Sequence, residues 1–189
     1  MVRRTRLSRR KFIRIAASAT VAVPLVSCMK ASGPWRFLTE SEARTLEAVC
    51  DRVVPADQDP GAAWAGAVNY IDVQLSGHYR RQQKAYREGI AGVNDSSRAK
   101  YGRDFSALTP DEQDRVLTDL ESGKAAGEIW RKRSSRQFFA MVVRHTMEGF
   151  YGDPRHGGNR NRVSWKMVKL PYPPVRGRIH YDLTKVSKS

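Results

Sequence analysis

The sequence has few of the residues and motifs on which cofactor-binding proteins and hydrolases depend. It holds only two cysteines, Cys28 and Cys50, so it has neither a disulfide framework nor a Cys-x-x-Cys-His site for covalent c-type haem. Neither a Gly-x-Gly-x-x-Gly dinucleotide loop nor a Gly-x-Ser-x-Gly nucleophile elbow occurs. We therefore expect no catalytic residues and no bound cofactor in this chain.

Apolar runs long enough to span a membrane are also missing. The run Ile15–Val26 covers 12 residues, whereas a spanning helix needs about 20. It follows Arg9, Arg10 and Phe12 in the order Ser-Arg-Arg-Lys-Phe-Ile-Arg, which is a twin-arginine export signal. Because that bacterial machinery carries proteins that have already folded, we expect residues 1–27 to be a signal peptide and the rest to be exported folded.

The end of the signal predicts a lipid anchor. Leu25-Val-Ser-Cys28 resembles the lipobox of bacterial lipoproteins, in which the cysteine is acylated and becomes the first residue of the mature protein. Acylated Cys28 would tether the domain to a membrane through residues 28–36 without any spanning helix. The alternative is an ordinary cleavable signal in which Cys28 has no role.

The charge balance is strongly basic. The formal charge is +15, and removal of residues 1–27, which hold seven basic and no acidic residues, lowers it to +8. A basic surface suits nucleic acid, anionic lipid or an acidic protein. Export argues against nucleic acid, so lipid and protein partners remain. Residues 175–189 form a basic tail.

The mature chain carries helical patterns and no convincing alternation of apolar and polar residues. Thr39 with Glu42 and Thr109 with Glu112 are capping boxes that predict helix starts. Apolar spacing predicts five helices, at about 40–54, 63–75, 79–100, 110–122 and 134–150. We expect an all-α domain of about five helices over residues 37–174, ending in an irregular, extended C-terminal arm beyond Gly152.

The most unusual segment is His145 to Arg160, where polar, aromatic and glycine residues are dense. A metal site or an acid–base pair is one interpretation, because it holds two histidines and two carboxylates: His145, Glu148, Asp153 and His156. A second interpretation is that the segment forms only local structure at a helix end. Contact with a partner protein is the third and is favoured, since aromatic and arginine residues anchor interfaces. The predicted interface comprises Phe150, Tyr151, Arg155, His156, Asn159 and Trp165.

Several motifs together resemble one protein family. They are Phe37-Leu-Thr39, Asp51-Arg-Val-Val-Pro-Ala-Asp57, Asp59-Pro-Gly-Ala62, Tyr70-Ile-Asp72, and Glu148-Gly-Phe-Tyr-Gly-Asp-Pro-Arg-His-Gly-Gly-Asn159 followed by Trp165-Lys166. In this order they resemble the gluconate 2-dehydrogenase subunit 3 family, over residues 37 to about 174. The basic tail matches no motif of that family.

The resemblance implies a division of labour between subunits. In that family the small subunit is not the catalyst: a large subunit of the glucose-methanol-choline type holds FAD, and a c-type cytochrome often passes on the electrons. The large subunit typically lacks a signal and crosses with the small one. We therefore expect a periplasmic, membrane-anchored accessory subunit. The alternative functions are those of a metal-binding domain and of a free-standing exported lipoprotein that binds anionic lipid.

Overall fold

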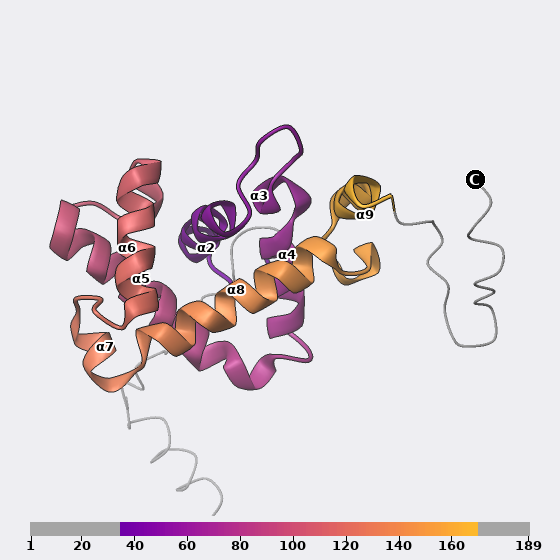
Figure 1. Cartoon of the computed structure of the whole chain (residues 1–189). Helices are drawn as coiled ribbons and strands as arrows, with labels where there is room; N and C mark the ends of the chain where they lie inside the picture. The colour runs from indigo at the N-terminus through magenta and orange to yellow at the C-terminus, as the bar shows by residue number, and fades with distance from the viewer. Residues whose placement is uncertain (1–34, 170–189) are drawn as a thin grey trace, which may run out of the picture. The chain divides into compact units, whose positions relative to one another are not determined.

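The computed structural model describes residues 35–169, which contain helices and no strand. The five longer helices lie where the sequence predicts helices (Figure 1): α2 (Glu40–Val53), α4 (Ala67–Leu75), α5 (Gln83–Tyr101), α6 (Pro110–Ser122) and α8 (Ser135–Tyr151). Two short helices lie between them, α3 (Ala62–Ala65) and α7 (Glu128–Lys132), and a third, α9 (Val163–Met167), follows α8. Single 3-10 turns occupy Arg80–Gln82, Phe105–Ala107, Pro154–His156 and Arg160–Arg162. The predicted all-α class is confirmed.

The two capping boxes start α2 and α6 as the sequence predicts. The Thr39 backbone N–H donates to Glu42 Oε2 at 2.8 Å, while the Glu42 N–H donates to Thr39 Oγ1 at 3.3 Å. Thr109 and Glu112 make the same reciprocal pair at 2.8 and 3.4 Å. Each box satisfies backbone donors that a helix start leaves without an intrahelical partner.

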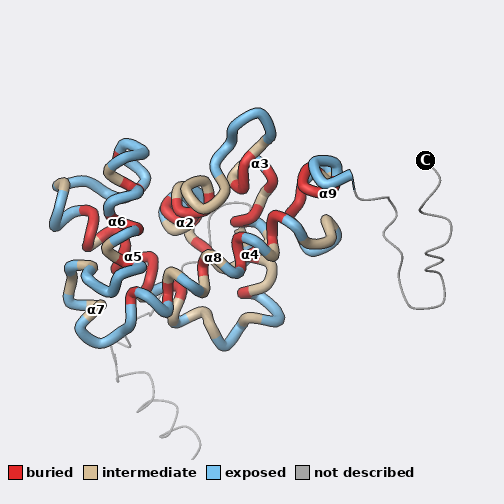
Figure 2. The backbone as a smooth tube through the Cα atoms, viewed as in Figure 1, coloured by how far each residue is buried: buried red, intermediate tan, exposed pale blue. Residues whose placement is uncertain are grey.

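Helix α8 is the element around which the core is assembled. It packs mainly against α4 and α6 and also contacts α2, α3 and α5. Its buried side chains include Phe138, Val142, His145 and Phe150. Figure 2 shows the buried stretches of α8 alternating with exposed ones, as expected for a helix that buries one face.

Two helices differ from the sequence prediction. The segment expected as one helix over 63–75 is broken into α3 and α4 at Gly66, whose φ of 78° is left-handed and ends the first helix. Trp130, which falls between the helices predicted at 110–122 and 134–150, lies in α7, where its Nε1 donates to Ser96 Oγ at 2.9 Å.

The predicted extended C-terminal arm is wrong for residues 153–167. This segment folds into two 3-10 turns and α9, and it packs against α3, α4 and α8. It shows no sequence period because consecutive residues take different backbone conformations, with left-handed φ at Gly157, Asn159, Asn161 and Arg162. The end of the predicted domain and the basic tail lie outside the described residues.

The N-terminal edge of the domain is fixed by one buried carboxylate. Asp72, only 1% exposed, accepts the backbone N–H groups of Arg36, Phe37 and Leu38 at 2.6, 2.9 and 2.9 Å. Trp35 also packs against the core. The folded part therefore includes Trp35 and Arg36, which the sequence assigned to the tether.

Candidate functional site

His145 is entirely buried on the inner face of α8. Its Nδ1 lies 2.8 Å from Tyr86 Oη and its Nε2 lies 3.2 Å from Arg144 Nη2. Because a guanidinium only donates, Nε2 accepts and the neutral ring carries its proton on Nδ1, toward Tyr86. Burial lowers the His145 pKa to about 4, and Arg144 adds to the effect while Glu148 opposes it. The ring is therefore neutral at neutral pH.

Glu148 is held by two tyrosines from other parts of the chain. It accepts from Tyr79 Oη at 2.6 Å and from Tyr70 Oη at 3.2 Å, and Arg144 Nε lies 3.8 Å away. The Tyr79 ring stacks on His145 with the centroids 4.2 Å apart. Burial raises the pKa of both Tyr70 and Tyr79, and the neighbouring carboxylate reinforces this. This cluster ties α4, the following turn and α8 together.

Asp153 and His156 do not join that cluster. The Asp153 carboxylate accepts from the Arg155 backbone N–H at 3.0 Å and from Arg155 Nη2 at 2.8 Å. His156 is exposed. Among residues 35–169 no group of three or more His, Cys, Asp or Glu side chains is placed to hold a metal ion. The four residues proposed for a metal or acid–base site are thus divided between separate local networks.

The glycine-rich end of the motif is a tightly packed turn. The Asn159 N–H donates to Gly149 O at 2.9 Å, its Nδ2 donates to Gly152 O at 2.9 Å, and its Oδ1 accepts from Ser164 N at 3.1 Å. Gly158 lies against the backbone of Gly149 so closely that there is no room for a Cβ. These contacts fold residues 153–167 back onto the end of α8.

Three of the six predicted interface residues are buried inside the domain. Phe150 is 1% exposed and Asn159 is not exposed at all; Trp165 is 7% exposed and donates from Nε1 to Tyr151 O at 2.8 Å. Their side chains pack within the domain and support the fold, and their part in an interface stays a prediction. Tyr151, Arg155 and His156 are exposed, so a contact through them stays a prediction.

Cys50 is a buried thiol in the core. Its Sγ lies 3.2 Å from Thr146 Oγ1, and burial raises the pKa of the thiol to about 12, although the contact with Thr146 opposes the shift. A thiol in such surroundings is unreactive. The export residues Arg9, Arg10 and Phe12 and the predicted lipidation site Cys28 lie outside the described residues.

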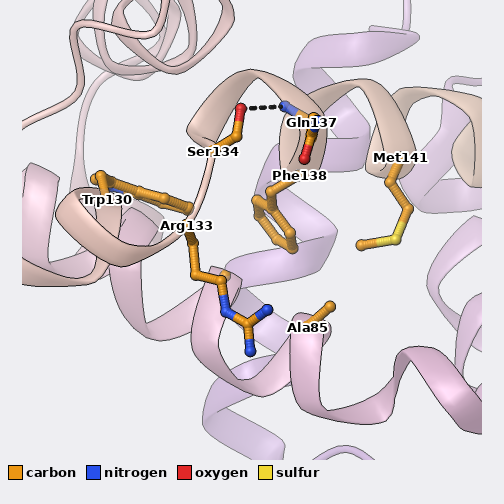
Figure 3. A pocket seen from close by; sticks show the side chains of 8 residues that line it. Ala85, Trp130, Arg133, Ser134, Gln137, Phe138 and Met141 are labelled. Carbon is orange, nitrogen blue, oxygen red and sulfur yellow. Dashed lines mark hydrogen bonds between the residues drawn. The ribbon is translucent and has the colours of Figure 1, made fainter.

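A small cavity lies at the other end of α8 (Figure 3). It measures about 200 Å³, and its wall includes Trp130, Phe138 and Met141. The Phe138 ring points toward α5, where Gly89 leaves space for it. With Arg133 as the ionisable side chain in its wall, the cavity has no acid–base pair with which to perform chemistry.

The organising roles of Tyr70, Tyr79 and Asp72 have no signal in the sequence. Glu148 is 78 and 69 residues from the two tyrosines, and no local pattern reports such distant pairs. The burial of Phe150 did have a signal, because Phe138, Val142, Thr146 and Phe150 recur every four residues on one helical face.

Fold and site together define a helical domain in which the segment His145 to Arg160 serves packing at the end of α8. The described residues include no helix that is long and apolar enough to cross a bilayer. The chain belongs to the gluconate 2-dehydrogenase subunit 3 family, whose model matches residues 40–171. It is therefore a subunit of a multi-subunit dehydrogenase complex, of the gluconate dehydrogenase type for which the family is named. No curated protein and no solved structure matches the chain.

Proposed function

We propose that this chain is the non-catalytic small subunit of a periplasmic, FAD-dependent sugar or sugar-acid dehydrogenase. In this proposal a glucose-methanol-choline type large subunit holds FAD and oxidises the substrate, and a c-type cytochrome accepts the electrons. The small subunit carries the folded flavoprotein through the twin-arginine machinery and supports its maturation. The observation that carries the proposal is the Arg9-Arg10 signal on a chain of the subunit 3 family.

The signal supports this role because the twin-arginine route accepts folded cargo. A flavoprotein must fold around FAD in the cytoplasm, so it needs a folded-protein route, and a partner with the address can supply it. Acylated Cys28 would then hold the complex at the membrane, since one diacylated residue anchors a protein without a spanning segment. Export as a folded complex also requires an interface that does not dissociate during transport.

The test is co-expression with an FAD-dependent large subunit that has no signal peptide and is encoded beside this chain. We expect periplasmic dehydrogenase activity with the wild-type chain, and cytoplasmic retention of the flavoprotein with the Arg9→Lys/Arg10→Lys variant. Export of the flavoprotein without this chain, or sugar oxidation by the isolated small subunit, contradicts the proposal. Fatty-acid labelling of the wild type and its loss in Cys28→Ala test the anchor separately.

A further inference from the structure

The outer face of α8 carries an exposed apolar stripe, defined here as Ala140, Val143, Met147 and Tyr151. The four positions are spaced by three, four and four residues, so they lie along one side of the helix. Ala140 is exposed and Val143 half-buried, and Met147 and Tyr151 are 39% and 44% exposed. At about 1.5 Å per residue the stripe is about 17 Å long.

A groove adjoins the N-terminal half of this stripe. It measures about 540 Å³ and is lined by Glu121, Arg136, Phe139, Ala140, Val143 and Arg144. Phe139, Ala140 and Val143 make part of its lining apolar, and Glu121, Arg136 and Arg144 add charged groups. Arg144 is 60% exposed, and Arg136 bonds to the carbonyl oxygens of Glu121 and Ser122 at the end of α6.

The stripe is apolar and the groove beside it carries charged side chains, an arrangement that resembles the apolar centre and polar rim of a protein interface. Permanent interfaces have an apolar centre and a polar rim, whereas transient electron-transfer contacts are smaller and more polar. An apolar face of this kind on an exported domain favours aggregation unless a partner covers it. Of the two partners in the proposed function, the flavoprotein is the one that must stay bound throughout export.

We propose that the α8 stripe is the surface on which the FAD-dependent large subunit docks, through an apolar patch bordered by carboxylates that face Arg136 and Arg144. This inference rests on the proposed function, because it names the contact that holds that complex together. Tyr151, already predicted as an interface residue, forms the C-terminal end of the stripe. Most of the docking surface is thus on α8 itself and not on residues 153–167.

The test compares matched charge insertions in the full-length chain, co-expressed with the same large subunit. Ala140→Glu and Met147→Glu place a carboxylate on the stripe, and Ala91→Glu places the same group on an exposed position of α5. We expect each stripe variant to weaken co-purification by about tenfold or more, as for a central interface residue, and Ala91→Glu to bind like the wild type. All three sites are exposed, so the melting temperatures should match.

A second measurement detects the contact directly in the intact complex. A photo-crosslinking amino acid at position 140 should attach to the large subunit, and one at position 91 should not. Binding of both stripe variants at wild-type strength, equal loss with Ala91→Glu, or crosslinking of position 140 to a second copy of this chain or to its own residues 170–189 overturns the inference. Failure of the wild-type chain to bind the flavoprotein overturns the proposed function instead, and the inference with it.

Discussion

The two faces of helix α8 differ in how their side chains are satisfied. On the inner face, His145, Thr146 and Phe150 are buried, and the polar groups of the first two find partners on α5 and α2. On the outer face, Met147 and Tyr151 expose much of their apolar surface. A buried face whose polar groups are paired stabilises the domain, whereas an exposed apolar face gains stability only when something binds to it.

This difference between the two faces makes the segment His145 to Arg160, although the most distinctive in the sequence, a weaker candidate for a binding surface than the outer face of α8. The glycines of this segment and Asn159 serve the inner side, where backbone atoms approach closely. The outer residues of α8 are ordinary apolar types that no motif marks. Changes on the inner side should therefore affect folding, and changes on the stripe should affect assembly alone.

The largest effect on stability is expected for Gly158→Ala. The new Cβ would overlap the Gly149 carbonyl oxygen and lie 3.0 Å from Gly149 Cα, and backbone cannot move aside as a side chain can. We expect the free energy of unfolding to fall by about 3 kcal/mol, the upper range for overpacking, measured by urea denaturation.

The matched control is Gly77→Ala, where the nearest atom would lie 3.7 Å away. It should change stability by less than about 0.5 kcal/mol, as most surface substitutions do. Equal stability of the two variants would show that residues 153–167 do not pack on α8 in the way described.

The inner side could be predicted only where the signals are local. Thr39 and Thr109 each lie three residues from their capping partner, so the sequence shows the helix starts directly. The turn at Asn159 depends on acceptors at Gly149 and Gly152 and on a left-handed φ of 45°, and no periodicity records such contacts. For the same reason the sequence predicted an extended arm there and placed buried Phe150 and Trp165 at the surface.

A pH effect of intermediate size is expected from His145. Its pKa is about 4 in the folded protein and 6.5 ordinarily, so the unfolded chain takes up the proton first as the pH falls. The stability from keeping this ring neutral is complete above about pH 6.5 and falls progressively at lower pH. By about pH 5, about 1.5 units lower, about 2 kcal/mol is lost, given about 1.4 kcal/mol per pKa unit.

Carboxylates titrate in the same pH range, so the effect of His145 is measured as a difference between the wild type and a variant. Unfolding free energies of the wild type and His145→Gln are compared between pH 4 and 7, and the variant should depend less steeply on pH. His156→Gln removes an exposed histidine and should keep the wild-type slope. A variant at position 145 as steep as the wild type would mean that the ring is accessible to protons in the folded state.

The smallest effect on stability is expected at the opposite end of α8. There the glycine of the neighbouring helix lies close to a side chain and not to backbone atoms. A Cβ on Gly89 would lie 2.1 Å from Phe138 Cε2, but the ring borders a cavity of about 200 Å³ into which it can turn. Alanine in a helix interior also stabilises the helix by up to about 1 kcal/mol relative to glycine. We therefore expect Gly89→Ala to cost only about 1 kcal/mol.

The double variant Gly89→Ala/Phe138→Leu makes this prediction specific, because the smaller side chain removes the overlap. If the clash is the cause, the cost of Gly89→Ala disappears or reverses in the Phe138→Leu background, as read from a double-mutant cycle of unfolding free energies. Additive effects would place the cost elsewhere in α5. Because neither residue belongs to the stripe, all these variants should still assemble with the large subunit, and this outcome separates folding through the inner face from binding through the outer one.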